Sequence, residues 1–106
     1  MKTSDLHPKK FMKSENLKEM MDGNKPATFS ISKVCIEELT EEGVKKKKPI
    51  LYLKGVEMGI VLNLTNTKMI EKQHGDDTDD WIGKKISLSV IMVEFRGDLV
   101  PAIRVL

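Results

Sequence analysis

The sequence has little of the side-chain chemistry on which catalysis, disulfides and metal sites depend. Its 106 residues include one cysteine, two histidines, one tryptophan and one tyrosine. A single cysteine cannot form an internal disulfide or a thiolate metal cluster. The sequence also contains no nucleophile elbow, no phosphate-binding glycine loop and no zinc-ligand spacing. We therefore expect a protein that is not an enzyme, with no catalytic residue, no metal and no cofactor.

Long apolar segments are also missing. No run approaches the roughly 20 apolar residues that span a bilayer, and residues 1–10 lack the apolar stretch of a signal peptide. We expect a cytoplasmic protein that makes no membrane contact. A chain of 106 residues fits one domain with one core, which we assign to residues 26–106, preceded by an N-terminal arm at residues 1–25.

Five segments are rich in β-branched or large apolar residues and are bounded by turn-forming residues. This pattern is typical of half-buried β-strands. The expected strands are residues 27–39, 49–54, 58–64, 85–95 and 99–106, with a tight hairpin turn at residues 96–98.

One helix of about two turns is expected between the third and fourth strands, where apolar residues recur at helical spacing. Thr65 or Asn66 can cap its first turn, and Gly75 suits the left-handed position at its end. A second short helix, from about Ser14 to Met21, or an irregular segment is expected to close one end of the domain.

The order of three strands, one helix and two strands predicts a mainly β fold, a five-stranded OB-like barrel. Apolar positions in the first strand change face between Ile31 and Val34, which predicts a β-bulge near Ser32 and Lys33. A similar change predicts a bend around residues 91–92. Long strands that bend midway suit a small barrel, whereas a β-sandwich is the alternative.

The charge is unevenly distributed. The net charge is +2, but residues 1–54 carry a net charge of +4 and residues 55–106 a net charge of −2. Four lysines, Lys45, Lys46, Lys47 and Lys48, are adjacent in what the strand pattern predicts to be the loop between the first two strands. In an OB barrel this loop flanks the ligand groove, so the run fits a phosphate-contacting loop. The alternative is a solvated loop that prevents edge pairing.

Few other residues are suited to contact a nucleic acid, because aromatic residues are only 5% of the chain. Alternation places Tyr52 and Lys54 on one face of the second strand and Asn63 on the outer face of the third. Arg96 lies in the second hairpin turn, which also flanks an OB groove. We expect Tyr52 to stack on a base, or instead to pack against the N-terminal segment.

An acidic cluster, Asp76, Asp77, Asp79 and Asp80, precedes Trp81. Clustered carboxylates can bind Mg²⁺ or Ca²⁺, but this cluster lacks the glycine and distal glutamate of an EF-hand loop. We expect these carboxylates to cap local amide groups, with Trp81 folded against one end of the domain.

The segment LNLTNTKMIEKQHGDDTDDWIGKKISLSV, followed by FRGDLVPAIRVL, resembles a family of small, mostly uncharacterised phage and prophage proteins. The resemblance covers residues 26–106. The matching positions are Asn63, Asn66, Gly75, Asp76, Asp77, Trp81, Gly83, Lys84 and Arg104. It implies an accessory of replication or recombination that binds single-stranded DNA.

The expected function is therefore non-catalytic binding of single-stranded DNA, with RNA as a related possibility. The expected contacts are Lys45, Lys46, Lys47, Lys48, Tyr52, Lys54, Asn63 and Arg96. The alternative is a protein-interaction or structural module of a phage complex, with a phage protein or a second copy of the chain as its partner.

Overall fold

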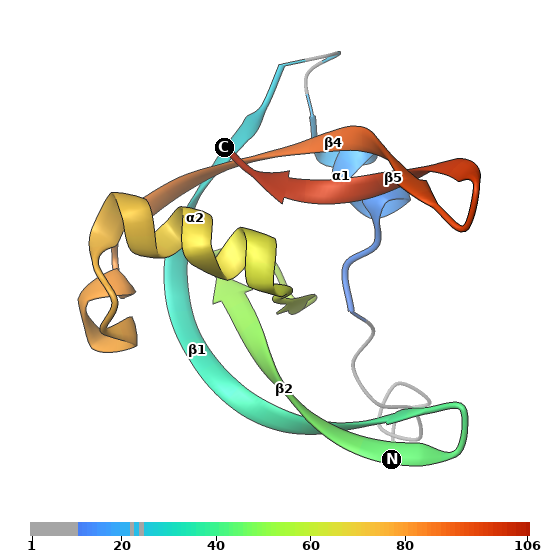
Figure 1. Cartoon of the computed structure of the whole chain (residues 1–106). Coiled ribbons are helices and arrows are strands. Elements are labelled where there is room, and N and C mark those ends of the chain that lie inside the picture. Colours follow the sequence, from blue (N-terminus) through green and yellow to red (C-terminus); the bar gives the residue numbers. More distant parts are fainter. Residues whose placement is uncertain (1–10, 22, 24) are drawn as a thin grey trace, which may run out of the picture.

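The strands form one antiparallel sheet, and the computed structural model describes residues 11–21, 23 and 25–106. The strand order is β3-β2-β1-β4-β5, so β3 and β5 are the two edges and the sheet is not closed (Figure 1). The predicted mainly β fold with five strands is confirmed. The elements are α1 (Ser14–Met20), β1 (Ala27–Glu41), β2 (Val44–Leu53), β3 (Ile60–Val61), α2 (Leu64–His74), the 3-10 turn η2 (Thr78–Trp81), β4 (Lys85–Phe95) and β5 (Asp98–Val105).

Strand β1 lies at the centre of the sheet and joins its two halves. Residues 27–30 pair with β4, and residues 31–41 pair with β2, with a register shift between Ile31 and Lys33. The predicted bulge is therefore confirmed. The Ile31 N–H donates to the Lys84 carbonyl at 2.8 Å, and the Gly83 N–H donates to the Ile31 carbonyl at 2.9 Å. These two bonds attach the bulge to the turn that precedes β4.

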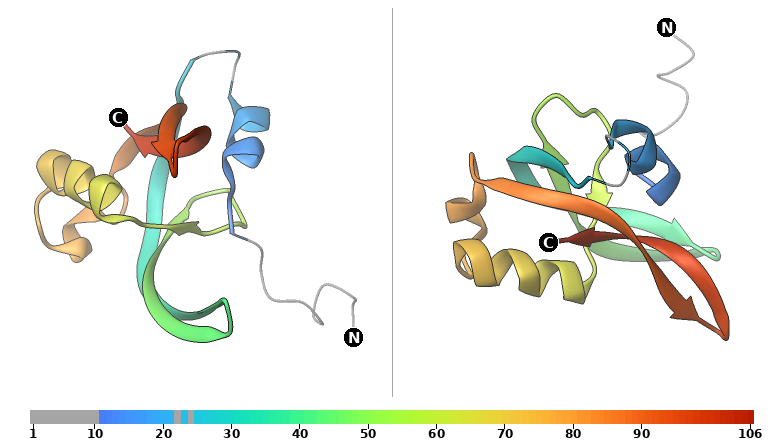
Figure 2. Two further views of the ribbon diagram at one scale, coloured as in Figure 1. Left: turned by 45° about the vertical axis from the view of Figure 1, so that its right-hand side comes forward. Right: turned by 90° about the horizontal axis from the view of Figure 1, so that it is seen from above.

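Both hairpins turn through two residues. The first hairpin (β1–β2) turns at Glu42 and Gly43, with φ of 51° and 78°, and the second hairpin (β4–β5) turns at Arg96 and Gly97, with φ of 52° and 84°. Two successive left-handed residues fit the twist of paired strands, and the predicted turn at residues 96–98 is confirmed. Both hairpins project toward the same side of the protein, away from α2 (Figures 1 and 2).

The prediction of a loop at Lys45–Lys48 is wrong. Strand β2 begins at Val44, and each of the four lysines is paired with a residue of β1. A two-residue turn leaves no room for a longer loop, and glutamates in the opposite strand relieve the repulsion among the lysines.

The third strand and the helix after it also differ from expectation. Strand β3 contains only two residues, and α2 is longer than expected, with 11 residues. Its N-cap is Asn63 rather than Thr65 or Asn66, because the Asn63 Oδ1 accepts the Asn66 N–H at 2.8 Å. This cap ends the strand early. The helix ends at Gly75, with φ of 94°, as predicted.

At residues 91–92, where we expect a bend, the pairing of β4 with β5 shows no register shift. Strands β4 and β5 pair without interruption from Leu88 with Val105 to Phe95 with Asp98. Ile91 and Met92 are both exposed, because the second hairpin extends past the core and neither of its faces is covered there.

The core lies between the two halves of the sheet and is covered by the helices. Helix α1, confirmed at Ser14–Met20, packs against β4 and β5 and places Leu17 in the core without exposed area. Trp81 is buried, and its Nε1–H donates to the Gly75 carbonyl at 2.8 Å. The core residues are Met12, Leu17, Ile31, Leu51, Leu53, Ile60, Leu62, Ile70, Trp81, Ile86, Leu88 and Val105.

The Asn66 side chain is polar but is buried among these apolar residues, with 3% of it exposed. Its Nδ2 donates to the Ile103 carbonyl at 3.0 Å, and its Oδ1 accepts the Val105 N–H at 3.1 Å. A neighbouring strand would make this same pair of bonds to the edge of β5. The side chain therefore attaches α2 to that edge.

We predict that Asn66→Ala lowers the free energy of unfolding by about 2 to 4 kcal/mol, because it removes both bonds and each polar group left without a partner costs roughly 1 to 3 kcal/mol. Urea denaturation measures the loss. Thr67→Ala is the control, since Thr67 lies in the same turn and its hydroxyl bonds only to the Asn63 carbonyl. A loss under about 1 kcal/mol for Asn66→Ala, the net value of one ordinary hydrogen bond, would contradict the attachment.

Candidate nucleic-acid interface

The four lysines of the first hairpin alternate between the two faces of β2. Lys45 and Lys47 share the face of the core residues Leu51 and Leu53, because alternate residues of a strand share a face. Lys46 and Lys48 share the opposite face with Tyr52. The run is therefore two pairs of lysines on opposite faces and not one contiguous basic patch.

Glutamates on β1 oppose these lysines. Lys48 is directly opposite Glu37, Lys47 is opposite Glu38, and the Lys45 Nζ lies 3.8 Å from the Glu38 Oε1. With Glu41 and Glu42, residues 37–48 of the hairpin contain four glutamates and four lysines. Exposed ion pairs contribute only about 0 to 1 kcal/mol, so an incoming phosphate can replace a glutamate as the partner of a lysine. At longer range, however, the glutamate charges offset the positive field of the four lysines.

Tyr52 lies half-buried on the outer face of β2 and has partners within the protein. Its hydroxyl donates to Glu37, the Lys33 Nζ lies 4.8 Å from its ring centroid, and a Cβ on Gly59 would come within 3.0 Å of its Cε1. A base that stacks on this ring would have to displace the Lys33 ammonium or the backbone at Gly59. The Cys35 thiol donates to the same Glu37 carboxylate at 3.4 Å.

These contacts shift two pKa values. The hydrogen bond to Glu37, with smaller contributions from burial and from the Glu37 charge, raises the pKa of Tyr52 to about 12. Burial, followed by the bond to Glu37, raises the pKa of Cys35. Both groups therefore stay protonated at neutral pH, which suits a structural cluster.

The other predicted contacts are dispersed. Lys54 is exposed just after β2, at the end opposite the lysine run, where its N–H donates to the Ser30 carbonyl at 2.9 Å. Asn63 is the N-cap of α2. Arg96 lies at the tip of the second hairpin, with its Cζ 5.1 Å from the centroid of the Phe95 ring. The structure does not gather the predicted contact residues into one surface.

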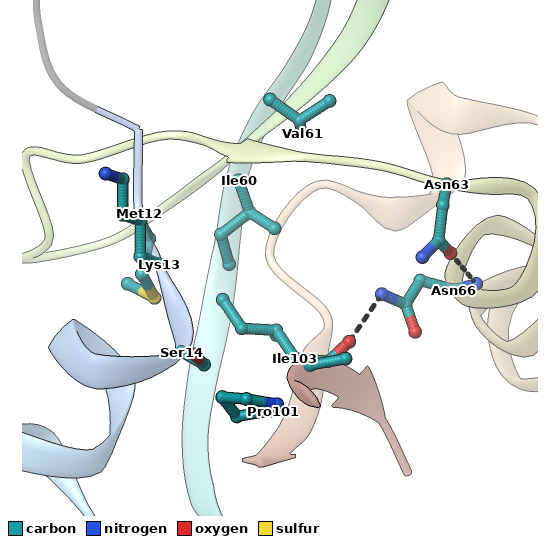
Figure 3. Close-up of a pocket in the computed structure, with 10 residues that line it drawn as sticks. Met12, Lys13, Ser14, Ile60, Val61, Asn63, Asn66, Pro101 and Ile103 are labelled. Carbon is teal, nitrogen blue, oxygen red and sulfur yellow. Dashed lines mark hydrogen bonds between the residues drawn. The ribbon is translucent and has the colours of Figure 1, made fainter. Parts of the chain in front are cut away.

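A pocket of about 210 Å³ lies between the two edge strands (Figure 3). Backbone and side chains of β3, β5, the start of α1 and the N-cap of α2 form its walls. The lining residues are Met12, Lys13, Ser14, Ile60, Val61, Asn63, Asn66, Pro101, Ala102 and Ile103. Asn63 is the predicted contact residue that lines it.

The edge of β3 faces this pocket. The Gly59 carbonyl accepts the Met12 N–H at 2.8 Å, and the Leu62 N–H donates to Pro49 of β2 at 3.0 Å. The backbone N–H and carbonyl groups of alternate residues point to the same side of a strand. Since the Gly59 carbonyl points away from β2, the N–H and carbonyl of Val61 also point away from β2. Pro101, at the edge of β5, has no N–H, which discourages pairing with a further strand.

Sequence reasoning missed most of the pocket. Asn66 was considered as a helix cap, but its bonds to residues nearly forty positions later leave no local pattern. Lys13, Ser14 and residues 101–103 gave no signal of a site. Arg104, a position of the family resemblance, lies on β5 with its Nη1 buried and without a hydrogen-bond partner in the described part of the chain.

In the acidic cluster, Asp77 caps a local amide group. The Asp77 Oδ1 accepts the Asp79 N–H at 3.0 Å and so caps η2. Within residues 11–21, 23 and 25–106, no three or more His, Cys, Asp or Glu side chains are grouped so that they could hold a metal ion. No helix in the same residues is long and apolar enough to cross a membrane.

Comparison of the chain with protein-family models, with curated proteins and with solved structures gives no significant match.

We predict that Tyr52 titrates with a pKa near 12 and that Glu37→Gln lowers this pKa toward the ordinary value of about 10. Because folding raises this pKa, protonated Tyr52 stabilises the folded protein fully below a pH of about 10, and this stabilisation is lost as the pH rises through 12. Tyr52 is the one tyrosine in the chain, so ultraviolet absorbance of tyrosinate measures it alone, with circular dichroism as the check for unfolding. A wild-type midpoint near 10 in the folded protein would contradict the bond to Glu37.

Proposed function

We propose that the protein is a partly open OB-like barrel that binds single-stranded nucleic acid without catalysis. The observation that carries the proposal is the strand order, in which β1 separates β2 from β4 and a helix joins β3 to β4. In OB folds the hairpin loops between strands 1 and 2 and between strands 4 and 5 flank the ligand. The corresponding hairpins here project to one side, and the pocket lies between the two edge strands.

The resemblance to phage and prophage proteins agrees with this proposal. It suggests single-stranded DNA in replication or recombination as the setting. RNA has the same phosphate chemistry, and binding assays with both polymers separate the two.

The cations best placed for phosphate contacts are Lys45 and Lys47, on the face of β2 that continues from the core, and Lys13, which lines the pocket. Glu38 is directly opposite Lys47, and its Oε1 lies 3.8 Å from the Lys45 Nζ. A bound phosphate has to compete with this carboxylate, so affinity is expected to be modest and strongly dependent on salt.

We predict that Glu38→Gln strengthens binding to oligo-dT, whereas the double variant Lys45→Ala/Lys47→Ala weakens it. Each single-strand phosphate contact contributes about −0.7 to the log–log salt slope, so losing two contacts flattens the slope by about 1.4. Fluorescence anisotropy at several salt concentrations measures both effects. Glu57→Gln is the control, because it makes the same charge change at an exposed residue in the loop after β2, away from the lysines.

Absence of binding to oligo-dT and oligo-U at low salt and high micromolar protein would refute the proposal. Binding that none of these variants alters would remove the first hairpin from the interface.

A second candidate function is self-association through the second hairpin. Ile91, Met92, Phe95 and Leu99 are all exposed there, and Leu99 is 70% exposed. Because alternate residues of a strand share a face and Leu99 pairs with Glu94, Met92 and Leu99 lie on one face of the hairpin, and Ile91 and Phe95 lie on the other. Each face thus presents a pair of exposed apolar side chains, and contiguous exposed apolar surface marks interaction sites.

We predict for this candidate that sedimentation velocity detects concentration-dependent dimers that Leu99→Ser abolishes. Leu64→Ser is the matched control, because Leu64 is 69% exposed on α2, away from the hairpin. A protein that is monomeric at every concentration would exclude this candidate without affecting the nucleic-acid proposal.

A further inference from the structure

We propose that the pocket between β3 and β5 receives one unstacked pyrimidine base of the bound strand, through a hydrogen bond from the Asn63 amide to a carbonyl oxygen of the base. This inference depends on the proposed function, and it adds a specific subsite and a class of base.

The size of the pocket restricts its occupant. Sites for drug-sized ligands commonly occupy about 300 to 1,000 Å³, whereas this pocket has about 210 Å³. A single small ring fits this size better than a larger ligand does. The walls contain Met12, Ile60 and Ile103 but no aromatic ring, so a base would be held by van der Waals contact and by hydrogen bonds at its edge rather than by aromatic stacking.

The polar end of the pocket has a defined donor. The Asn63 Oδ1 accepts the Asn66 N–H, which fixes the orientation of the Asn63 amide and assigns its nitrogen to the other side. Figure 3 shows this nitrogen turned away from the Asn66 backbone and toward the pocket. The neighbouring Asn66 amide is used at both atoms by Ile103 and Val105. Asn63 can therefore donate to a ligand without losing its role as the helix cap.

A donating amide selects for an acceptor. Thymine, uracil and cytosine each present a carbonyl oxygen on a single ring, whereas adenine and guanine, which also have acceptors, are two-ring bases and fit a pocket of about 210 Å³ less well. At the other side of the pocket Ser14 is half-buried and Lys13 is exposed, so the Lys13 ammonium can reach the phosphate of the same nucleotide. The lining thus has a donor for the base and a cation for the backbone.

The test compares oligo-dT with a fully abasic strand of the same length, using fluorescence anisotropy with wild-type protein and three variants. Asn63→Asp keeps a good N-cap acceptor but removes the amide donor. We expect it to weaken oligo-dT binding by about threefold to tenfold, the effect of one hydrogen bond, while changing abasic-strand binding less than about twofold. Ser14→Val reduces the volume of the pocket and should weaken oligo-dT selectively, whereas Ser14→Ala, which adds no bulk, should not.

Each outcome separates this inference from the proposed function. If neither strand binds, the proposed function fails. If both strands bind wild-type protein equally, or if Asn63→Asp weakens both to the same extent through its added charge, nucleic-acid binding stands and the base pocket is wrong. Thermal unfolding verifies that each variant is folded.

Discussion

The buried amide of Asn66 is the interaction on which the arrangement of this small domain depends. Strand β5 is an edge of the sheet, and β3, which could pair with it, has only two residues because the chain turns into α2 at Asn63. The Asn66 side chain bonds to both Ile103 and Val105 in place of a strand. This one residue therefore holds the helix against an edge that would otherwise expose unpaired backbone.

Because the Asn66 side chain, and not a strand, pairs with β5, space remains farther along the edges of β3 and β5. The pocket occupies that space, next to the Asn63 cap and the first turn of α1. The hairpins on either side extend past the core and carry different surfaces: the first has paired lysines and glutamates, and the second has exposed apolar residues. Electrostatic attraction alone is thus a weak basis for the binding that we propose, which would depend more on shape at the open edge.

Much of the fold could be predicted because its signals are local. The bounds of β4, the turn at Arg96 and the bulge near Ser32 follow from alternation and turn residues. The start of β2 could not be predicted from the lysines alone, since their pairing depends on glutamates across the hairpin. The length of β3 could not be predicted either, because it depends on whether Asn63 or Thr65 caps α2. Of the residues that line the pocket, sequence reasoning singled out Asn63, but it placed Asn63 on the outer face of the third strand, whereas Asn63 is the N-cap of α2. The pocket itself could not be predicted, because contacts between Asn66 and β5 join distant segments.

Amide hydrogen exchange at Val105, measured by NMR, tests the role of Asn66 most directly. In wild-type protein the Val105 N–H donates to a side chain rather than to a strand. The account predicts strong protection there, lost in Asn66→Ala while the Leu88 and Ile86 amides in β4 remain protected. Rapid exchange at Val105 in the wild type, or protection that survives Asn66→Ala, would contradict it.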